Sequence, residues 1–238
     1  MQRYFSKKLI DNHFILADDD LYHINTVMRM RNGDSIEVVY DNELYLGELN
    51  IENKIIKIKM INKINYNTDI KSKVTLIVPL LKEHKMDYIL QKSTELGVDT
   101  IIPVSLSRCI VKVDNNKEEK KLERWGKICK EASEQSKRLD IPYISKIMNI
   151  KDIIKLPGCK LICSTINKDN IISNILPNII NKDITFIFGP EGGFSENEES
   201  LLISNDYIPI TFGSSILRSE TAPLYMLSII NYEANKNA

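Results

Sequence analysis

The sequence has little cysteine or histidine. Its four cysteines are Cys109, Cys129, Cys159 and Cys163. Its three histidines lie far apart, at positions 13, 23 and 84. The absence of any Cys-x-x-Cys pair argues against a structural zinc site, and scattered free thiols are typical of proteins in a reducing cytosol. We therefore expect a cytoplasmic protein that binds no metal.

Long apolar runs are also missing. No apolar stretch approaches the roughly 20 residues that a helix needs to span a bilayer. The apolar residues that follow Lys7 and Lys8 stop at Asp11, which predicts that there is no signal peptide. We therefore expect a soluble protein without a membrane partner.

The sequence also lacks an excess of basic charge. The 32 Lys and Arg residues are balanced by 32 Asp and Glu residues, whereas proteins that bind nucleic acid over a broad surface carry a pronounced positive excess. Any contact with RNA must therefore come from a local patch of the surface.

The first part of the chain is rich in predicted strands. Asp18–Asp20 precede a short helical stretch that runs through Arg29, and an Asn32-Gly33 stop signal follows it. Runs with the character of strands then cover Ser35–Tyr40, Leu44–Leu49 and Lys54–Ile61. Residues 62–73 are polar and without periodicity, so we place a linker there. The sequence thus predicts a β-rich domain over 1–68 and a second domain over 69–238.

From Val74 onward, strands alternate with helices. Val74–Leu80 is a continuous apolar run, as expected for a strand that is covered on both faces. Further strands are expected at Thr100–Val104, Tyr143–Met148 and Lys160–Ser164. Helices are expected around 86–96, 117–138 and 221–232, with a short one at 171–180 that is interrupted at Pro177. This alternation is typical of an α/β domain with a mostly parallel sheet.

Two similar turns lie near the end of the chain. The apolar run Ile184–Phe188 leads into Gly189-Pro190-Glu191-Gly192-Gly193, and a second short apolar run leads into Phe212-Gly213-Ser214-Ser215. Ser195 and Glu198 form a predicted capping box for a helix between the turns. Glycine-rich turns let the backbone approach a ligand closely, although a single such turn more often serves only as a tight connection.

The pair of turns is far more specific. Gly-Pro-Glu-Gly-Gly-Phe-Ser-x-x-Glu, followed by Phe-Gly-x-x-Ile-Leu-Arg-x-Glu-Thr-Ala, closely resembles the RsmE family of RNA methyltransferases, which belongs to the SPOUT superfamily. The resemblance covers nearly the whole chain and includes the segments 85–98 and 123–138. It implies an α/β fold with an N-terminal PUA-like β-barrel domain and a C-terminal SPOUT domain, whose mostly parallel sheet carries a trefoil knot.

The resemblance also implies a reaction. Such enzymes transfer a methyl group from S-adenosyl-L-methionine to the N3 atom of a uridine in 16S rRNA, either free or in the 30S subunit, and act as homodimers. Adenosine needs an apolar slot edged by backbone groups, which both turns can supply. The predicted cofactor-binding residues are Phe188, Gly189, Glu191, Gly193, Phe212, Gly213, Ile216 and Leu217, with Thr165 as a weaker candidate.

The uracil N3 atom becomes a nucleophile only when its proton leaves. A nearby cation favours the resulting anion, and Arg218 and Arg138 are the candidates. The alternative is that they form structural ion pairs with Glu220 or Glu134. Glu220 is also our candidate for the general base.

Two features bear on RNA binding. Arg29 and Arg31 lie at the end of the predicted helical stretch, where the negative end of the helix dipole favours cations. The resemblance instead implies that they grip RNA together with Arg3. The family usually has Pro-Arg where this chain has Ser214-Ser215, so one arginine that could anchor RNA or a partner subunit is missing.

Two other functions remain open. The chain could be an RNA-binding module without catalytic activity, in which case the paired turns would serve no ligand. It could also be an enzyme that binds nucleotide phosphates. No Gly-x-Gly-x-x-Gly motif or P-loop follows the first strand of the second domain, and Glu191 places a negative charge where a phosphate would sit.

Overall fold

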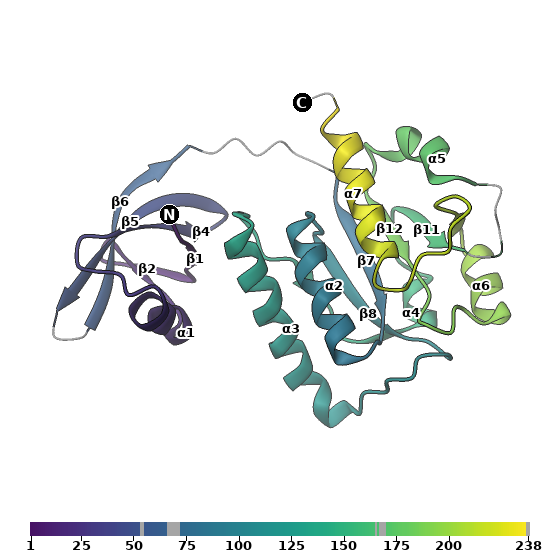
Figure 1. The fold of residues 1–238 in the computed structure, drawn as a ribbon, viewed down its shortest axis with the longest axis horizontal. Helices are drawn as coiled ribbons and strands as arrows, with labels where there is room; N and C mark the ends of the chain where they lie inside the picture. Colours follow the sequence, from purple (N-terminus) through teal and green to yellow (C-terminus); the bar gives the residue numbers. More distant parts are fainter. Residues whose placement is uncertain (53–54, 66–71, 165, 167–169, 237–238) are drawn as a thin grey trace. The chain divides into compact units, whose positions relative to one another are not determined.

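The computed structural model describes residues 1–52, 55–65, 72–164, 166 and 170–236 (Figure 1). The chain divides into two compact units. One consists of Met1–Asp69 together with Lys130–Ile141, and the other of Ile70–Cys129 together with Pro142–Ala238. Each unit has its own buried apolar core. Half of the predicted linker over 62–73, residues 66–71, lies outside the described residues, and residues 62–64 belong to a strand instead.

The amino-terminal unit contains a six-stranded sheet. Its strands are β1 (Arg3–Phe5), β2 (Lys8–Ile10), β3 (His13–Ile15), β4 (Ser35–Tyr40), β5 (Glu43–Glu52) and β6 (Ile55–Ile64). They lie in the order β1-β4-β5-β6-β3-β2. The three strands that the sequence predicted between residues 35 and 61 are confirmed as β4, β5 and β6. The first three strands were missed because a run of three residues is too short to show a period.

This sheet must curl, because β1 and β2 occupy its opposite edges and yet are joined by Ser6 and Lys7 alone. A flat sheet of this size would be about 24 Å wide, whereas the chain from Phe5 to Lys8 reaches at most about 11 Å. Ser6 connects the two sides of the curled sheet, because its amide donates to the Val39 oxygen of β4 and its hydroxyl oxygen lies 2.8 Å from the main-chain oxygens of Lys8 and Ile15. This curvature agrees with the predicted PUA-like barrel.

The predicted helical stretch begins and ends earlier than expected, because it includes Asp18–Asp20 and stops at Val27. It consists of α1 (Asp18–Tyr22) and a π-helical turn, η1 (His23–Val27). Arg29 has a φ of 52°, which ends the helical path.

The carboxyl-terminal unit is built on a seven-stranded sheet. Its strands are β7 (Val74–Pro79), β8 (Thr100–Ser105), β9 (Tyr143–Ile144), β10 (Met148–Asn149), β11 (Cys159–Cys163), β12 (Ile184–Ile187) and β13 (Ile208–Ile210). The order is β10-β8-β7-β12-β11-β13, with β9 also on β8, and every recorded pairing is parallel. The predicted parallel α/β architecture is therefore confirmed. In place of the single strand expected over 143–148, two short strands, β9 and β10, both pair with β8.

Helices cover this sheet. They are α2 (Glu83–Glu95), α3 (Asn115–Gln135), α4 (Ile150–Ile153), α5 (Ile172–Ile179), α6 (Glu196–Ile203) and α7 (Ala222–Ala234). Figure 1 shows α2 and α7 side by side in front of the sheet, and the two helices are in contact. All four residues of β12 are buried, as its apolar sequence predicted. None of these helices, within the described ranges, is long and apolar enough to cross a membrane.

One expectation about these helices is wrong. Pro177 lies inside α5, which continues to Ile179. A proline lacks an N–H group and so removes one main-chain hydrogen bond. That loss falls in the last turn of this short helix, which therefore persists beyond Pro177.

Candidate active site

A cavity of about 750 Å³ lies at one edge of the parallel sheet. Its walls come from the segments that follow β7, β8, β11, β12 and β13, which is the edge where parallel strands have their carboxyl ends. Ligands of open α/β sheets bind at this edge, where the chain switches direction across the sheet. Here that switch lies between the neighbouring strands β7 and β12. The volume of the cavity is within the range of small-molecule pockets.

The first glycine-rich turn forms one wall of the cavity. It starts at Phe188, which is buried, and closes with a hydrogen bond of 2.8 Å from the Gly193 amide to the Pro190 oxygen. A methyl group on Gly189 would lie 3.1 Å from the Gly193 Cα atom, so the turn closes this tightly only with glycine. Gly193 has a φ of 68° and leaves open space where a side chain would be. The turn therefore exposes backbone to the cavity.

Arg108 holds this turn from outside the motif. Its Nη1 atom donates hydrogen bonds of 2.9 Å to the main-chain oxygens of Gly192 and Phe194. Sequence reasoning missed this residue. Its position just after β8, at the ligand-binding edge of the sheet, is the signal that could have identified it.

Helix α6 anchors the same turn to two neighbouring loops. The predicted capping box is confirmed, because the Ser195 side chain accepts from the Glu198 amide and the Glu198 carboxylate accepts from the Ser195 amide. Glu198 also accepts a hydrogen bond of 2.7 Å from the Ser107 amide. Burial alone would raise the pKa of Glu198, but the hydrogen bonds from Ser107 and Ser195 lower it. The next residue, Glu199, accepts from the Ser164 hydroxyl.

The second glycine-rich turn forms the opposite wall. Phe212 packs edge-on against Tyr225 of α7, with ring centroids 5.1 Å apart. Gly213 has a φ of 110°, and the residues that follow it to Ile216 are exposed. The chain then bends into α7 through hydrogen bonds from the Thr221 and Ala222 amides to the Arg218 oxygen.

The structure brings the predicted cofactor residues together. The ones that line the cavity are Phe188, Gly189, Glu191, Gly193, Phe212, Gly213, Ile216 and Leu217. Thr165 lies outside the described residues. The apolar rings and Leu217, together with the open glycine backbone, fit the adenosine and amino-acid parts of S-adenosyl-L-methionine. Their roles as ligands of that cofactor stay predictions.

Lys85 connects the two turns. Its ammonium group lies 3.1 Å from the Glu191 carboxylate in the first turn and 3.1 Å from the Glu220 carboxylate after the second. Burial opposes the charged form of Lys85, but hydrogen bonds to both carboxylates raise its pKa. Lys85 is therefore an ammonium ion at neutral pH. Sequence reasoning assigned this residue no role.

The same contact bears on the proposed base. Burial alone would raise the pKa of Glu220, but hydrogen bonds from its own amide, Lys85 and Ser219 lower it. A general base works best when its pKa is near the working pH. Glu220 therefore fits the role of general base poorly, although it does line the cavity.

The two candidate arginines lie in different units. Arg218 lines the cavity, is exposed, and makes no ion pair with another described residue. Arg138 belongs to the amino-terminal unit and pairs with Asp140 at 2.7 Å. Of the two carboxylates named as alternative partners, Glu220 pairs with Lys85 and Glu134 pairs with Lys130. The catalytic roles of both arginines stay predictions.

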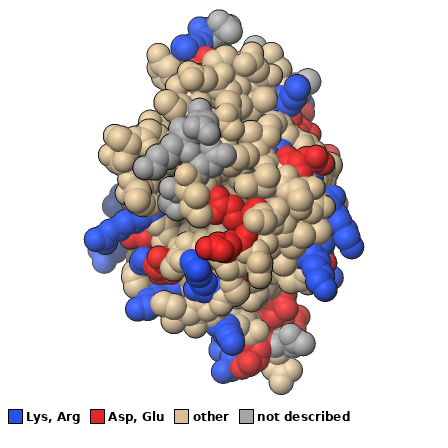
Figure 2. Space-filling model, turned by 90° about the vertical axis from the view of Figure 1, so that its right-hand side faces the viewer, with Lys and Arg blue, Asp and Glu red and all other residues tan. Residues whose placement is uncertain are grey.

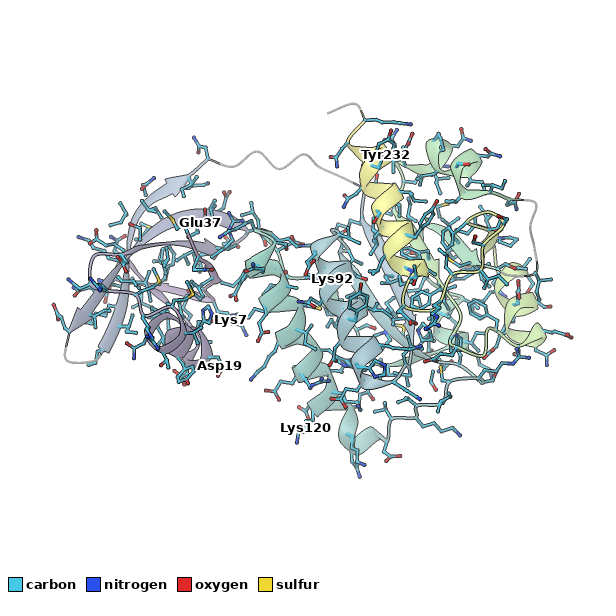
Figure 3. The ribbon with its side chains drawn as sticks, in the orientation of Figure 1. Lys7, Asp19, Glu37, Lys92, Lys120 and Tyr232 are labelled. Carbon is cyan, nitrogen blue, oxygen red and sulfur yellow. The ribbon has the colours of Figure 1, made fainter. Side chains whose placement is uncertain are left out.

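The three predicted RNA-binding arginines differ in exposure. Arg3 is only 3% exposed, because it pairs at 2.9 Å with Glu37 of β4 and also donates to the main-chain oxygens of Lys137 and Arg138. These contacts hold the Lys130–Ile141 segment within the amino-terminal unit and leave Arg3 little access to a ligand. Figure 3 labels Glu37 in the amino-terminal unit. Arg29 and Arg31 are exposed, so they are the better placed of the three.

Other charges and thiols point to no further chemistry. Figure 2 shows acidic and basic side chains interspersed on one face, as the balanced composition suggests. Cys163 lines the cavity, but burial raises its pKa to about 12, so it stays a neutral thiol. Among the described residues, no group of three or more His, Cys, Asp and Glu is arranged to hold a metal ion.

Comparisons with known proteins match both units. Residues 68–231 match a family model described as RNA methyltransferase domain, and residues 16–61 match the RNA methyltransferase PUA domain. The chain is 34% identical to Ribosomal RNA small subunit methyltransferase E of Bacillus subtilis, over 98% of this chain and 97% of that protein. Identity to the protein of the same name from Mesomycoplasma hyopneumoniae is 38%, over 96% and 98% of the two chains.

Solved structures agree with these matches. A crystal structure of Ribosomal RNA small subunit methyltransferase E from Neisseria gonorrhoeae, bound to S-adenosylmethionine, has a TM-score of 0.86 and 31% identity, covering 98% of this chain and 97% of that chain. A methyltransferase of Legionella pneumophila in complex with the same cofactor has a TM-score of 0.89 and 26% identity over the same shares.

Proposed function

We propose that this chain methylates the N3 atom of uridine 1498 in 16S rRNA. The chain belongs to the ribosomal RNA small subunit methyltransferase E family. The methyl donor is S-adenosyl-L-methionine. The observation that carries the proposal is the meeting of two glycine-rich turns in one cavity at the carboxyl edge of a parallel sheet. A module that only binds RNA has no use for such a cavity.

The bound cofactor supplies a methyl group on a positively charged sulfur atom. Transfer to a nitrogen is an in-line displacement, so its rate depends on how well the reacting atoms are held at close distance. The apolar side chains of Phe188, Phe212 and Leu217 exclude water from the adenosine. Main-chain groups of the two turns fix its orientation, because their glycines leave the backbone open.

Arg218 acts on the acceptor. Its guanidinium group is exposed at the cavity and is not neutralised by a described carboxylate, so it can lie beside the uracil ring. A cation there stabilises the N3 anion and lowers the pKa of the N3–H group. With that pKa lowered, solvent can accept the proton, and the poor fit of Glu220 as a base is no obstacle.

The amino-terminal unit binds the RNA. A PUA-like domain over 1–68 presents Arg29 and Arg31 to phosphates or unpaired bases, while residues 69–238 form the knotted SPOUT domain that carries out the reaction. The target uridine must leave its stack to enter the cavity. Ser214 and Ser215, which stand where the family usually has Pro-Arg, leave more of the RNA contact to this unit.

The active form is a homodimer that works in the cytoplasm, where ribosomal subunits are made. Tyr225 and Tyr232 of α7 are 42% and 66% exposed, and Tyr88 of the neighbouring helix α2 is 45% exposed. Exposed aromatic side chains of this kind are enriched at protein interfaces. Light scattering on the purified protein should give twice the mass of one chain.

Mass spectrometry of ribosomal RNA tests the function directly. The purified protein is incubated with methyl-labelled S-adenosyl-L-methionine and either 30S subunits or free 16S rRNA that lack the modification. We expect labelled 3-methyluridine at the target position in one of the two substrates. Cofactor binding without methylation of either substrate would contradict the proposal. The absence of a thermal shift with the cofactor would favour a module that only binds RNA.

A further inference from the structure

The ion-pair bridge of Lys85 connects three separate elements of the carboxyl-terminal unit. Lys85 lies in the first turn of α2, Glu191 in the turn after β12, and Glu220 in the turn that leads into α7. Both ion-pair distances are 3.1 Å, and the three side chains are between 19% and 28% exposed. All three residues line the cavity. The bridge thus crosses from one wall of the cavity to the other.

A lysine is unfavourable at this position of helix α2. The first turn of a helix carries partial positive charge, which favours acidic residues and disfavours lysine. Partial burial of the ammonium group adds a further cost. Two carboxylates from outside the helix offset both costs. The position is therefore favourable only because of the contacts that Lys85 makes across the cavity.

The second turn is attached at its start, where main-chain hydrogen bonds join Thr211 to Asn170 and Ile172 and the Phe212 ring packs against Tyr225. Thr211 forms local hydrogen bonds of 3.2 and 3.4 Å with Gly213, and the residues that follow to Ile216 are exposed. Glu220 lies within the bend that the Thr221 amide closes onto the Arg218 oxygen. The ion pair between Lys85 and Glu220 ties this bend to α2, and the bend carries Arg218.

We propose that Lys85 is a positioning residue for this reaction. This proposal rests on the function proposed above. Its ammonium group sets the separation of the two turns and so holds both the donor pocket and the backbone of Arg218 in place. Without it, Glu191 and Glu220 face each other as two like charges, and the exposed turn moves away from the first. Lys85 itself need touch neither the donor nor the uridine.

Calorimetry with S-adenosyl-L-methionine tests this role without RNA. We expect Lys85→Met to weaken donor binding by about 10- to 100-fold, since two charge-assisted hydrogen bonds are lost. Lys85→Arg keeps the charge and should restore most of the affinity. The matched control is Lys82→Met, at an exposed lysine just before the same helix, and it should leave the affinity unchanged. Equal affinities of the Lys85→Met variant and the wild type would overturn the proposal.

A double-mutant cycle separates positioning from a general effect on stability. In the Lys85→Met background, Glu220→Gln removes one of the two opposing charges and should recover part of the donor affinity, whereas in the wild type the same change should reduce it. A change of the same sign and size in both backgrounds would mean that the residues act independently, which contradicts the bridge. Lys85→Gln serves the same cycle if the methionine variant does not fold.

Turnover gives a second readout. Because the bridge holds the bend that carries Arg218, Lys85→Met should lower kcat at saturating donor as well as raise the KM for the donor. An effect on KM alone would overturn the link to Arg218. A wild-type protein that does not bind the donor would instead overturn the proposed function, so the two failures are distinct.

Discussion

The guanidinium group of Arg108 and the main-chain oxygen of Gly192 are joined by a hydrogen bond of 2.9 Å. The same nitrogen also donates to the Phe194 oxygen. A methyl group on Gly192 would lie 3.3 Å from the Arg108 Cβ atom, so the turn and the arginine also pack closely. The first glycine-rich turn is thus shaped by a side chain from the neighbouring loop as well as by its own glycines.

Replacing Arg108 by Met should therefore weaken donor binding. The substitution keeps much of the apolar stem but removes two charge-assisted hydrogen bonds to the turn, and we expect about a tenfold loss of affinity. Isothermal titration calorimetry measures the loss. Lys112→Met removes an exposed positive charge from the same loop and is the control. An equal loss in both variants would mean that charge alone, rather than the turn contact, is responsible.

The change in unfolding free energy on replacing a glycine by alanine should depend on the space around the new methyl group and on the backbone φ at that position. Gly189→Ala places a methyl group 3.1 Å from the Gly193 backbone and should cost about 1–3 kcal/mol of unfolding free energy. Gly193→Ala meets open space but keeps a φ of 68°, which costs about 1 kcal/mol. Urea unfolding measures both effects.

Gly126 provides the control for this series. It lies within α3 and has open space where a Cβ atom would lie. Gly126→Ala should stabilise the protein by about 0.5–1 kcal/mol, because alanine is the better helix former. A Gly193→Ala variant as stable as the Gly126→Ala variant would argue against strain at the turn.

Glu198 should make stability depend on pH. Its pKa is lowered in the folded protein from an ordinary value of 4.5, so its contribution is present above that value and is lost as the pH falls through the folded pKa. Glu198→Gln should cost about 1–2 kcal/mol at pH 7, since the hydrogen bonds from Ser107 and Ser195 lose their charge assistance.

The test compares the wild type with the Glu198→Gln variant by urea unfolding from pH 7 down to pH 3. The difference in free energy should shrink below about pH 4.5. A difference that stays constant across this range would show that the carboxylate charge does not carry the effect.

Local sequence patterns account for much of the fold and for both walls of the cavity. The apolar run of β12, the Ser195 capping box and the glycines at 189, 193 and 213 each mark a structure that a few neighbouring residues determine. The alternation of strands and helices adds that the sheet is parallel, and in such a sheet the turns after β12 and β13 fall on the same edge.

Contacts between residues that are distant in the sequence could not be predicted from local sequence patterns. The ion pairs of Lys85 join three segments whose relative placement is set by the sheet order β7-β12-β11-β13. The attachment of Lys130–Ile141 to the amino-terminal unit likewise includes hydrogen bonds from Arg3, at the start of the chain. Neither contact produces a local period or motif, so sequence reasoning gave Arg3 a surface role and Lys85 none.

Replacing both Arg29 and Arg31 should reduce the salt dependence of RNA binding. Each arginine that contacts a phosphate contributes about one unit to the slope of log affinity against log salt concentration. We therefore expect the double change to Ala to lower the slope by about two. Filter binding across a salt series measures it.

The Arg29→Lys, Arg31→Lys double variant keeps both charges and is the matched control. It should keep the slope while losing any affinity that depends on guanidinium stacking. An unchanged slope in the alanine variant would leave both arginines as surface charges.

Arg218→Ala should separate binding of the donor from transfer of its methyl group. The side chain is exposed at the cavity, and its main-chain oxygen, which closes the bend into α7, is unaffected by the substitution. Donor affinity by calorimetry should therefore change little. The rate of methylation should fall by about 100-fold or more, since one charge that stabilises the N3 anion is lost.

The dependence of the rate on pH identifies the step. If Arg218 lowers the pKa of the N3–H group, the alanine variant should recover part of its rate as the pH rises towards the pKa of free uridine, because the anion then forms without help. Arg218→Lys keeps a cation at this position and should retain a larger share of the rate at neutral pH. A variant whose rate stays equally low at every pH would place Arg218 in RNA positioning instead of anion stabilisation.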